Sequence, residues 1–235
     1  AQGAEKPAAP APLGGRSAED FLRLPAELIV AYSFMALAKV GPGDRVVDLG
    51  SGNERTVIAA VQHGAQGVGL ASSGEMANAL RLRAELSGAI HRSRFFVPDP
   101  MDFDLKDTSV VVLPSGPSIN ANLISRLFML PTGTRIVGRA PAMGAWSHDE
   151  NIREDSNSGC GAQCDTYFWV VPAKVAGTWS LPYGELKLEQ HFQRLSGTLK
   201  AIGMVVPVTG RLRGDQISLT MGEGVEFSGR VTPTE

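Results

Sequence analysis

Along the first two thirds of the chain, segments with hydrophobic residues at helical spacing alternate with short, continuous runs of hydrophobic residues. Segment 26–39 places apolar residues such as Leu28 and Tyr32 at helical spacing, which predicts an amphipathic helix. Short apolar runs then alternate with helix-like segments, and this alternation predicts an α/β fold with a parallel sheet and right-handed crossovers. The predicted strands are 45–49, 67–70, 94–97, 109–113 and 134–138, and the predicted helices between them are 56–63, 75–86 and 120–130.

The pattern changes after about residue 147. Polar and Gly-rich residues predict a loop at 148–165, and from residue 166 onward short strands are separated by turn residues. This second pattern indicates an antiparallel β meander, either a small sheet or a partial barrel. The expected strands are 167–171, 177–181, 185–195, 197–202, 205–212, 216–221 and 225–231.

Four segments follow from these patterns. Residues 1–16 are rich in Ala, Pro and Gly and are predicted to form an extended tail. The α/β domain is expected at 17–147, the loop at 148–165 and the β-rich C-terminal domain at 166–235.

The composition of the chain bears on the kinds of partner that it can bind. Hydrophobic residues make up 43% and charged residues 20%, which is typical of a globular chain, and the formal net charge is −2. Such a charge gives no general field that attracts nucleic acid, so no nucleic-acid partner is expected. The sequence holds no run of about 18 apolar residues, so no transmembrane segment is expected in this chain.

The beginning of the chain and its two cysteines bear on the compartment. Ala1 in place of Met fits a mature N-terminus after removal of an export signal, and a trimmed sequence is the alternative. Cys160 and Cys164 lie in a Gly-rich segment that would let them reach disulfide distance, and none of the four histidines has ligand spacing to them. We expect a local disulfide and a periplasmic or other extracytoplasmic location, with free thiols as the alternative.

The turn after the first predicted strand has the composition of a ligand-binding turn. Its sequence is Asp48-Leu49-Gly50-Ser51-Gly52, and a predicted helix follows. Glycines permit a tight turn and close approach of the backbone to a ligand, and the N-terminus of the helix presents free N–H groups.

The order of the segments resembles the class I S-adenosylmethionine-dependent methyltransferases. The segments concerned are 46–55, with the Gly-rich turn; 96–99, which ends in Asp99; 107–113; and 130–137, with a Pro-Thr-Gly turn before a strand. Segment 169–179 resembles the tail of bacterial, often exported, methyltransferase-like proteins. This resemblance covers most of residues 26–231 and implies a Rossmann-like, doubly wound, mostly parallel sheet. It also implies S-adenosylmethionine as cofactor, with Asp48, Gly50, Gly52 and Asp99 as the binding residues.

The chain departs from the family at positions that grip the cofactor. Glu54 stands where the family has a third glycine, and Ala71 stands where the family has an acidic residue that binds the ribose hydroxyls. Loss of that charge-assisted contact would cost roughly 1.5–3 kcal/mol, for which Ser72 or Ser73 compensates only weakly. In the segment that would line the acceptor pocket, prolines stand at 114 and 117, and another stands at 98 before Asp99.

For several residues, a structural role is the alternative to a functional role. Asp48 either contacts the cofactor or only holds the glycine turn, and Asp99 either contacts adenine or forms a turn before Pro100. Glu54 is favoured as a solvated acid at a helix start. The segment 148–150 (His-Asp-Glu) is favoured as a polar loop over a metal or acid–base cluster, and the three tryptophans (146, 169 and 179) are favoured as anchors between layers.

Three functions remain open from the sequence. The leading hypothesis is a non-catalytic accessory or structural subunit, without cofactor, of a periplasmic or membrane-associated complex whose protein partners are unknown. A respiratory or photosynthetic complex is one candidate host. The first alternative is an active methyltransferase with an atypical S-adenosylmethionine site, and the second is a module that binds another small ligand in the same pocket.

Overall fold

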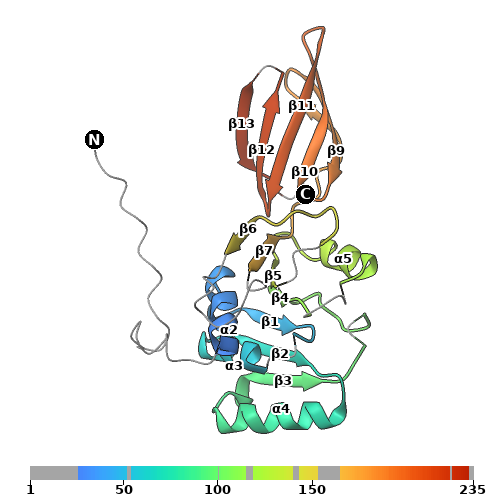
Figure 1. Cartoon of the computed structure of the whole chain (residues 1–235). Coiled ribbons are helices and arrows are strands. Elements are labelled where there is room, and N and C mark those ends of the chain that lie inside the picture. Colours follow the sequence, from blue (N-terminus) through green and yellow to red (C-terminus); the bar gives the residue numbers. More distant parts are fainter. Residues whose placement is uncertain are drawn as a thin grey trace, which may run out of the picture.

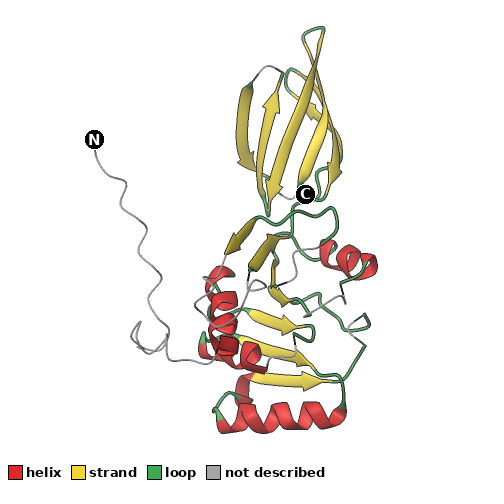
Figure 2. Ribbon diagram, viewed as in Figure 1, coloured by secondary structure: helices red, strands yellow, loops and turns green. Residues whose placement is uncertain are grey.

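The computed structural model describes residues 26–51, 54–99, 101–114, 119–139, 143–152, 165–222 and 224–232. Two sheets organise them: a seven-stranded sheet with helices, and a six-stranded antiparallel sheet that follows it in the chain (Figures 1 and 2). We call them sheet A and sheet B. Cys160 and Cys164 lie outside the described residues, as does the tail 1–16. No described helix is long and apolar enough to cross a membrane.

Sheet A has the strand order β3-β2-β1-β4-β5-β7-β6. The first five of these strands pair in parallel, and β7 and β6 continue the sheet in antiparallel fashion. The expected doubly wound, mostly parallel sheet is therefore confirmed. The strands are β1 (Arg45–Asp48), β2 (Gln66–Leu70), β3 (Ser93–Phe96), β4 (Val110–Val112), β5 (Arg135–Gly138), β6 (Glu150–Ile152) and β7 (Thr166–Val170).

Alternate residues of the central strands serve two separate cores. Val46 on β1 and Val110 on β4 pack with the helices α2 (Ala26–Leu37) and α3 (Glu54–Gln62). Val47 and Val111 face the opposite side and pack with α5 (Ala121–Phe128). Because side chains alternate along a strand, one apolar run fills both cores, which is why these strands show no polar face.

The helices begin where the sequence offers a capping side chain. Ser73 caps α4 (Gly74–Leu86), and its hydroxyl oxygen accepts a hydrogen bond from the backbone N–H of Met76 at 3.1 Å. Asn120 caps α5 in the same way and accepts from Leu123 at 2.9 Å. Each cap satisfies a backbone donor that the first turn of a helix leaves unpaired. A short 3-10 helix, η2 (Ile90–Arg92), leads into β3.

The boundary between the two sheets lies later in the chain than expected. The sequence assigns 167–171 to the β-rich domain and predicts a loop at 148–165, but β7 pairs with β5 and β6 pairs with β7 within sheet A. Both Phe168 and Trp169 are buried although they point to opposite faces. A strand that is apolar on both faces needs cover on both sides, and sheet A supplies that cover while an open meander does not.

Sheet B is a meander in which each strand pairs with its neighbours in the chain. Its eight-residue core includes Leu186, Leu195 and Leu212. The expected single strand 185–195 is wrong, because the chain turns at Phe192, whose φ is 53°. The strands are β8 (Gly177–Leu181), β9 (Gly184–His191), β10 (Arg194–Ala201), β11 (Met204–Arg213), β12 (Gln216–Met221) and β13 (Val225–Arg230).

Aromatic side chains join the two sheets. The ring of Phe192, in the turn between β9 and β10, stacks on Trp146 at a centroid distance of 5.4 Å and meets the edge of Phe128 at 5.1 Å. Trp146 and Trp169 are almost fully buried, and the indole N–H of Trp169 donates to the carbonyl of Trp146 at 3.0 Å. These two tryptophans therefore anchor the joint, as expected. Trp179 lies in sheet B and packs beside its core.

Candidate functional site

The carboxyl ends of four parallel strands meet along one edge of sheet A, where loops follow β1, β2, β3 and β4. The chain passes from β1 to β2 on one side, whereas β4 lies on the other side of β1. In open α/β sheets, ligands bind at the carboxyl edge where the strand order reverses. Asp48, Ala71, Asp99 and Pro114 stand at or just after these strand ends. The fold thus brings the separate sequence motifs to one edge.

Asp48 holds the turn after β1. Its side chain is almost fully buried, and Oδ1 accepts hydrogen bonds from the backbone N–H groups of Gly50 at 2.9 Å and Ser51 at 2.6 Å. The other carboxylate oxygen, Oδ2, accepts from the Ser51 hydroxyl. Gly50 has φ of 103°, a left-handed conformation that favours glycine. The direct role of Asp48 in this structure is therefore to fix the turn.

The same burial changes the acidity of Asp48. Removal from water raises the pKa of Asp48 to about 6, against the opposing effect of hydrogen bonds from Ser51 and Gly50. A carboxyl group with this pKa changes charge near neutral pH. Because its acceptors are occupied by the turn, the titration of Asp48 is coupled to the shape of the turn.

A small cavity opens beside this turn, between β2, α3 and α4. Its volume is about 120 Å³, below the roughly 300 Å³ of a complete small-molecule site. Gly69 lets the side chains of Phe95 and Val57 pack closely on β2 at the wall of the cavity, since a Cβ there would lie 2.8 Å from the ring of Phe95 and 3.1 Å from Val57. It can hold part of a ligand whose remainder lies along the open edge. The lining residues are Asp48, Gly50, Val57, Gly69, Leu70, Ala71, Ser72, Met76, Leu80 and Phe95.

The end of β2 offers no carboxylate to this cavity. Ala71 is buried there, and its backbone N–H is already donated to the carbonyl of Phe96 at 2.8 Å. Of the two serines that follow, Ser73 is committed to capping α4. Ser72 is exposed and lines the cavity, so its hydroxyl is the polar side-chain group closest in sequence to the end of β2.

Asp99 follows β3 and shapes a turn. Its Oδ1 accepts a hydrogen bond from the backbone N–H of Met101 at 2.8 Å, and its carbonyl accepts from Asp102 at 2.9 Å. The carboxylate is exposed. Phe96 and Val97, just before it, are about half exposed at 45% and 49%. The sequence predicts Phe96 and Val97 as ordinary strand residues. Their exposure in the structure shows an apolar surface beside Asp99.

Other positions of the predicted site are only partly described. Gly52 lies outside the described residues, as do 115–118 in the segment after β4. Glu54 is the first residue of α3, but its side chain is not among those described. Pro114 is buried directly after β4.

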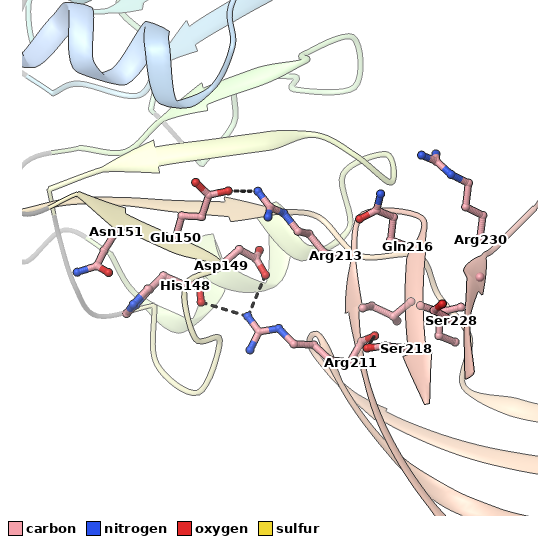
Figure 3. A pocket seen from close by; sticks show the side chains of 13 residues that line it. His148, Asp149, Glu150, Asn151, Arg211, Arg213, Gln216, Ser218, Ser228 and Arg230 are labelled. Carbon is pink, nitrogen blue, oxygen red and sulfur yellow. Dashed lines mark hydrogen bonds and ion pairs between the residues drawn. The ribbon is translucent and has the colours of Figure 1, made fainter. Parts of the chain in front are cut away.

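A second polar region lies between the two sheets (Figure 3). A groove of about 720 Å³ there is lined by the segment 148–151 and by β11 to β13. The side chain of Asp149 is buried, accepts a hydrogen bond from the N–H of Val170 at 2.9 Å and pairs with Arg211 at 3.0 Å. Glu150 pairs with Arg213. The acidic segment therefore joins the sheets, and no group of three or more His, Cys, Asp or Glu in the described part of the chain is arranged for a metal ion.

No family model matches the sequence, and a search of curated proteins also finds no match. Among solved structures, an RNA methyltransferase from Salinibacter ruber in complex with S-adenosyl-L-homocysteine is 31% identical, with a TM-score of 0.54. That match covers 63% of this chain and 93% of the other.

Two further matches are more distant. A SAM-dependent methyltransferase from Geobacter sulfurreducens with S-adenosyl-L-homocysteine is 27% identical, covering 50% of this chain and 48% of that one, with a TM-score of 0.40. A geranyl diphosphate C-methyltransferase from Streptomyces coelicolor A3(2), with the same ligand, Mg²⁺ and geranyl diphosphate, is 22% identical, with a TM-score of 0.41 and coverage of 48% and 45%. This chain thus spans about half the length of each.

Proposed function

The chain belongs to the class I S-adenosylmethionine-dependent methyltransferases, and we propose that it binds S-adenosylmethionine at the carboxyl edge of sheet A and transfers the methyl group. The observation that supports this most is the turn at Gly50, which the buried carboxylate of Asp48 holds open at the point where the strand order reverses. The 31% identical relative with S-adenosyl-L-homocysteine matches over 93% of its own length.

The residues at this edge fit parts of the cofactor. Gly50 has no side chain and faces open space, since a Cβ built there meets only the carbonyl of Leu70 at 3.8 Å, so the backbone of the turn can approach a ligand closely. Phe96 and Val97 offer an apolar surface for a purine ring, and the exposed carboxylate of Asp99 offers an acceptor for its amino group. Ser72 offers a hydroxyl to the ribose.

Methyl transfer of this kind asks little chemistry of the protein. The cofactor supplies an activated methyl group on a sulfonium centre. The work of the chain is to orient the bound molecule and align the acceptor, which is catalysis by placement. The Asp48 turn and the Ser73-capped α4 fix the backbone on both sides of the small cavity.

The ribose position is the weak point of this fit. Ala71 cannot form the two charge-assisted hydrogen bonds that an acidic residue would form, so we expect an affinity about 10–100-fold below that of a site with a carboxylate. The Salinibacter relative is named an RNA methyltransferase. A net charge of −2 gives this chain no general attraction for a phosphate backbone, and the proposal does not extend to RNA.

Calorimetric titration with S-adenosylmethionine and S-adenosyl-L-homocysteine tests the proposal. We expect measurable binding to the unmodified chain and about 10–100-fold tighter binding to Ala71→Glu. Ala79→Glu adds the same charge at an exposed position of α4 and should change nothing. Absence of binding in both the unmodified chain and a correctly folded Ala71→Glu would sink the proposal.

A second candidate rests on the same Ala71. A buried apolar residue at the ribose position also suits a non-catalytic subunit that keeps the scaffold without the cofactor, in the periplasm or at a membrane complex, as the leading sequence-based hypothesis holds. Under this alternative the chain co-purifies with protein partners and Ala71→Glu gains binding that the unmodified chain lacks. The comparisons favour methyl transfer over this alternative, which reverses the order that the sequence suggested.

A further inference from the structure

Sheet B has a free end that is unusually apolar. The turns after β8, β10 and β12 lie at the end pointing away from sheet A (Figure 1). Tyr183 and Ile202 stand in two of these turns, exposed by 76% and 87%. Met204 and Val225, the first residues of β11 and β13, are exposed by 64% and 68%. No large hydrophobic residue is comparably exposed at the opposite, proximal turns of the described sheet.

Ile202 occupies a backbone conformation that does not suit it. Its φ is 49°, and Gly203 after it has φ of 76°. A two-residue hairpin turn with both central residues in the left-handed region favours Asn, Asp or Gly at the first position. A β-branched side chain is disfavoured there. Folding alone would therefore favour a small polar residue at position 202.

The turn at the other end of the same sheet explains what such a residue can do. Phe192 also has positive φ, 53°, at the first position of the turn between β9 and β10. Its ring packs between Trp146 and Phe128, and this contact offsets the unfavourable backbone. Ile202 holds the equivalent position at the free end, but its side chain is almost fully exposed. The described part of the chain thus offers Ile202 no contact that would offset its backbone conformation in the way that Trp146 and Phe128 do for Phe192.

We propose that the free end of sheet B inserts into the surface of a lipid bilayer. The shape favours a bilayer over a folded partner. Gly184 pairs with Ala201, so the β8–β9 and β10–β11 turns end at one level, whereas β12 ends opposite Val208, several residues lower. Hairpin tips at different levels form a small and uneven contact surface. A stable protein interface needs a matched area of about 800 Å² on each partner. A bilayer requires no matched shape.

The charges at this end specify the kind of lipid surface. The β8–β9 and β10–β11 turns, within 181–184 and 201–206, contain no charged residue, whereas the lower β12–β13 turn carries Glu223, and Glu226 follows Val225. The first charges behind the tips, Glu185 and Lys200, pair with each other at 3.9 Å. Tyr183 has an apolar ring and a polar hydroxyl, the combination enriched at membrane–water interfaces. Two uncharged tips backed by a balanced pair, with only acidic residues in the lower turn, match a neutral bilayer, so apolar insertion supplies the binding and anionic lipid is not required.

Co-sedimentation with phosphatidylcholine vesicles tests the proposal on the full chain. We expect the chain to sediment with the vesicles to the same extent at low and high salt. Ile202→Asn should lower the bound fraction at least about fivefold, because a buried aliphatic side chain contributes the equivalent of about one order of magnitude in affinity. The same variant should melt at a higher temperature, because Asn suits the turn. A residue with a purely structural role would not show this combination.

A matched control and a spectroscopic readout complete the experiment. Leu86→Asn removes an 80% exposed leucine at the end of α4 and should leave vesicle binding unchanged. In Ile202→Trp, the added fluorescence should shift to the blue and be quenched by brominated lipid. The proposal is overturned if the chain stays in the supernatant, if it binds only anionic lipid in low salt, or if Leu86→Asn weakens binding equally. A dimer in sedimentation velocity that Ile202→Asn dissociates would assign the tips to a second copy instead.

Discussion

Each end of sheet B has a two-residue turn whose first residue is a large hydrophobic residue with positive φ, but the surroundings of the two residues differ. At the proximal end Phe192 adopts positive φ and buries its ring between two aromatic side chains of the neighbouring unit. At the distal end Ile202 adopts positive φ and stays 87% exposed. Packing therefore offsets the unfavourable backbone conformation of Phe192 at one end, whereas no packing among the described residues offsets that of Ile202 at the other.

One charged pair at each end repeats this difference. At the proximal end, Arg211 pairs at 3.0 Å with Asp149, whose side chain is 1% exposed. At the distal end, Lys200 and Glu185 are 3.9 Å apart and both are more than half exposed. Tertiary contacts compensate the irregular backbone at Phe192, whereas Ile202 has no compensating contact among the described residues.

The largest effect is expected at the proximal turn. Phe192→Asn relieves the backbone but removes the ring from the Trp146 stack, and the loss of a packed Phe outweighs the gain at the turn. We expect the free energy of unfolding to fall by about 3 kcal/mol, as measured by chemical denaturation. A variant as stable as the unmodified chain would show that the aromatic joint contributes nothing to the free energy of unfolding. The two ends of sheet B would then not differ in this respect.

The left-handed turn at Gly50 is held by a carboxylate instead of by packing. The pKa of Asp48 is raised from 3.8 to about 6 by burial, so the folded state binds more protons than the unfolded state between these values. Stability from this group is present below about pH 4 and is lost as pH rises through 6, a change of about 2–3 kcal/mol.

Denaturation between pH 4 and pH 6.5 checks this sign. Asp48→Asn is a suitable reference because both backbone donors reach the same oxygen, Oδ1, and the Ser51 hydroxyl can reverse its hydrogen bond. The unmodified chain should lose stability relative to Asp48→Asn as the pH rises. Parallel curves for the two proteins would contradict the raised pKa.

The buried acid at the joint comes next. Asp149→Ala leaves the N–H of Val170 and the guanidinium of Arg211 without their acceptor, and we expect a loss of about 2 kcal/mol. Arg211→Ala should cost less than Asp149→Ala, because Arg211 is 46% exposed. If the order of these two losses is reversed, the joint does not depend on the buried carboxylate.

The distal turn should respond in the opposite direction. Ile202→Asn replaces a β-branched residue by one that favours the left-handed region, and we expect a gain of about 1 kcal/mol in the free energy of unfolding. The same substitution thus has opposite signs at Phe192 and Ile202. A loss of stability at Ile202 would show that its side chain is already packed within the chain.

The smallest effect is expected at the distal ion pair. Lys200→Ala should change the free energy of unfolding by less than about 0.5 kcal/mol, since exposed pairs are screened by water. A larger loss of unfolding free energy would mean that the distal ion pair stabilises the fold as much as the pair at the joint does.

Much of the fold followed from the sequence. The alternation of apolar runs and helical segments predicted every strand from β1 to β5 and the helices α2 to α5 within a few residues. Hydrophobic periodicity is a local signal, and these elements lie in local order along the chain. The meander was likewise predicted, except that its first expected strand, 167–171, belongs to sheet A and that the expected strand 185–195 is divided at Phe192. Nothing local marks that turn, because its stabilising contact comes from Trp146, which is distant in sequence.

The candidate site followed only in outline. The motif Asp48-Leu49-Gly50-Ser51-Gly52 identified the scaffold and the edge where a cofactor would bind. The structure shows that the oxygens of Asp48 accept hydrogen bonds from the turn, and its contact with a cofactor stays a prediction. It also showed Ser73 committed to a helix cap and Phe96 half exposed beside Asp99. Hydrogen-bond partners and exposure depend on the whole fold, and residue identity alone does not specify them.

The sequence by itself determined the order of the elements and, through its resemblance to a known family, the scaffold, because hydrophobic period and motif order are properties of residue type and spacing. Only the tertiary structure decided that β7 and β6 complete sheet A, that Phe192 locks the two sheets together, and that Ile202 stands exposed in a strained turn. Each of these outcomes depends on which distant surface covers a given side chain. The hydrophobic pattern records that a residue can be buried, and the fold alone determines what buries it.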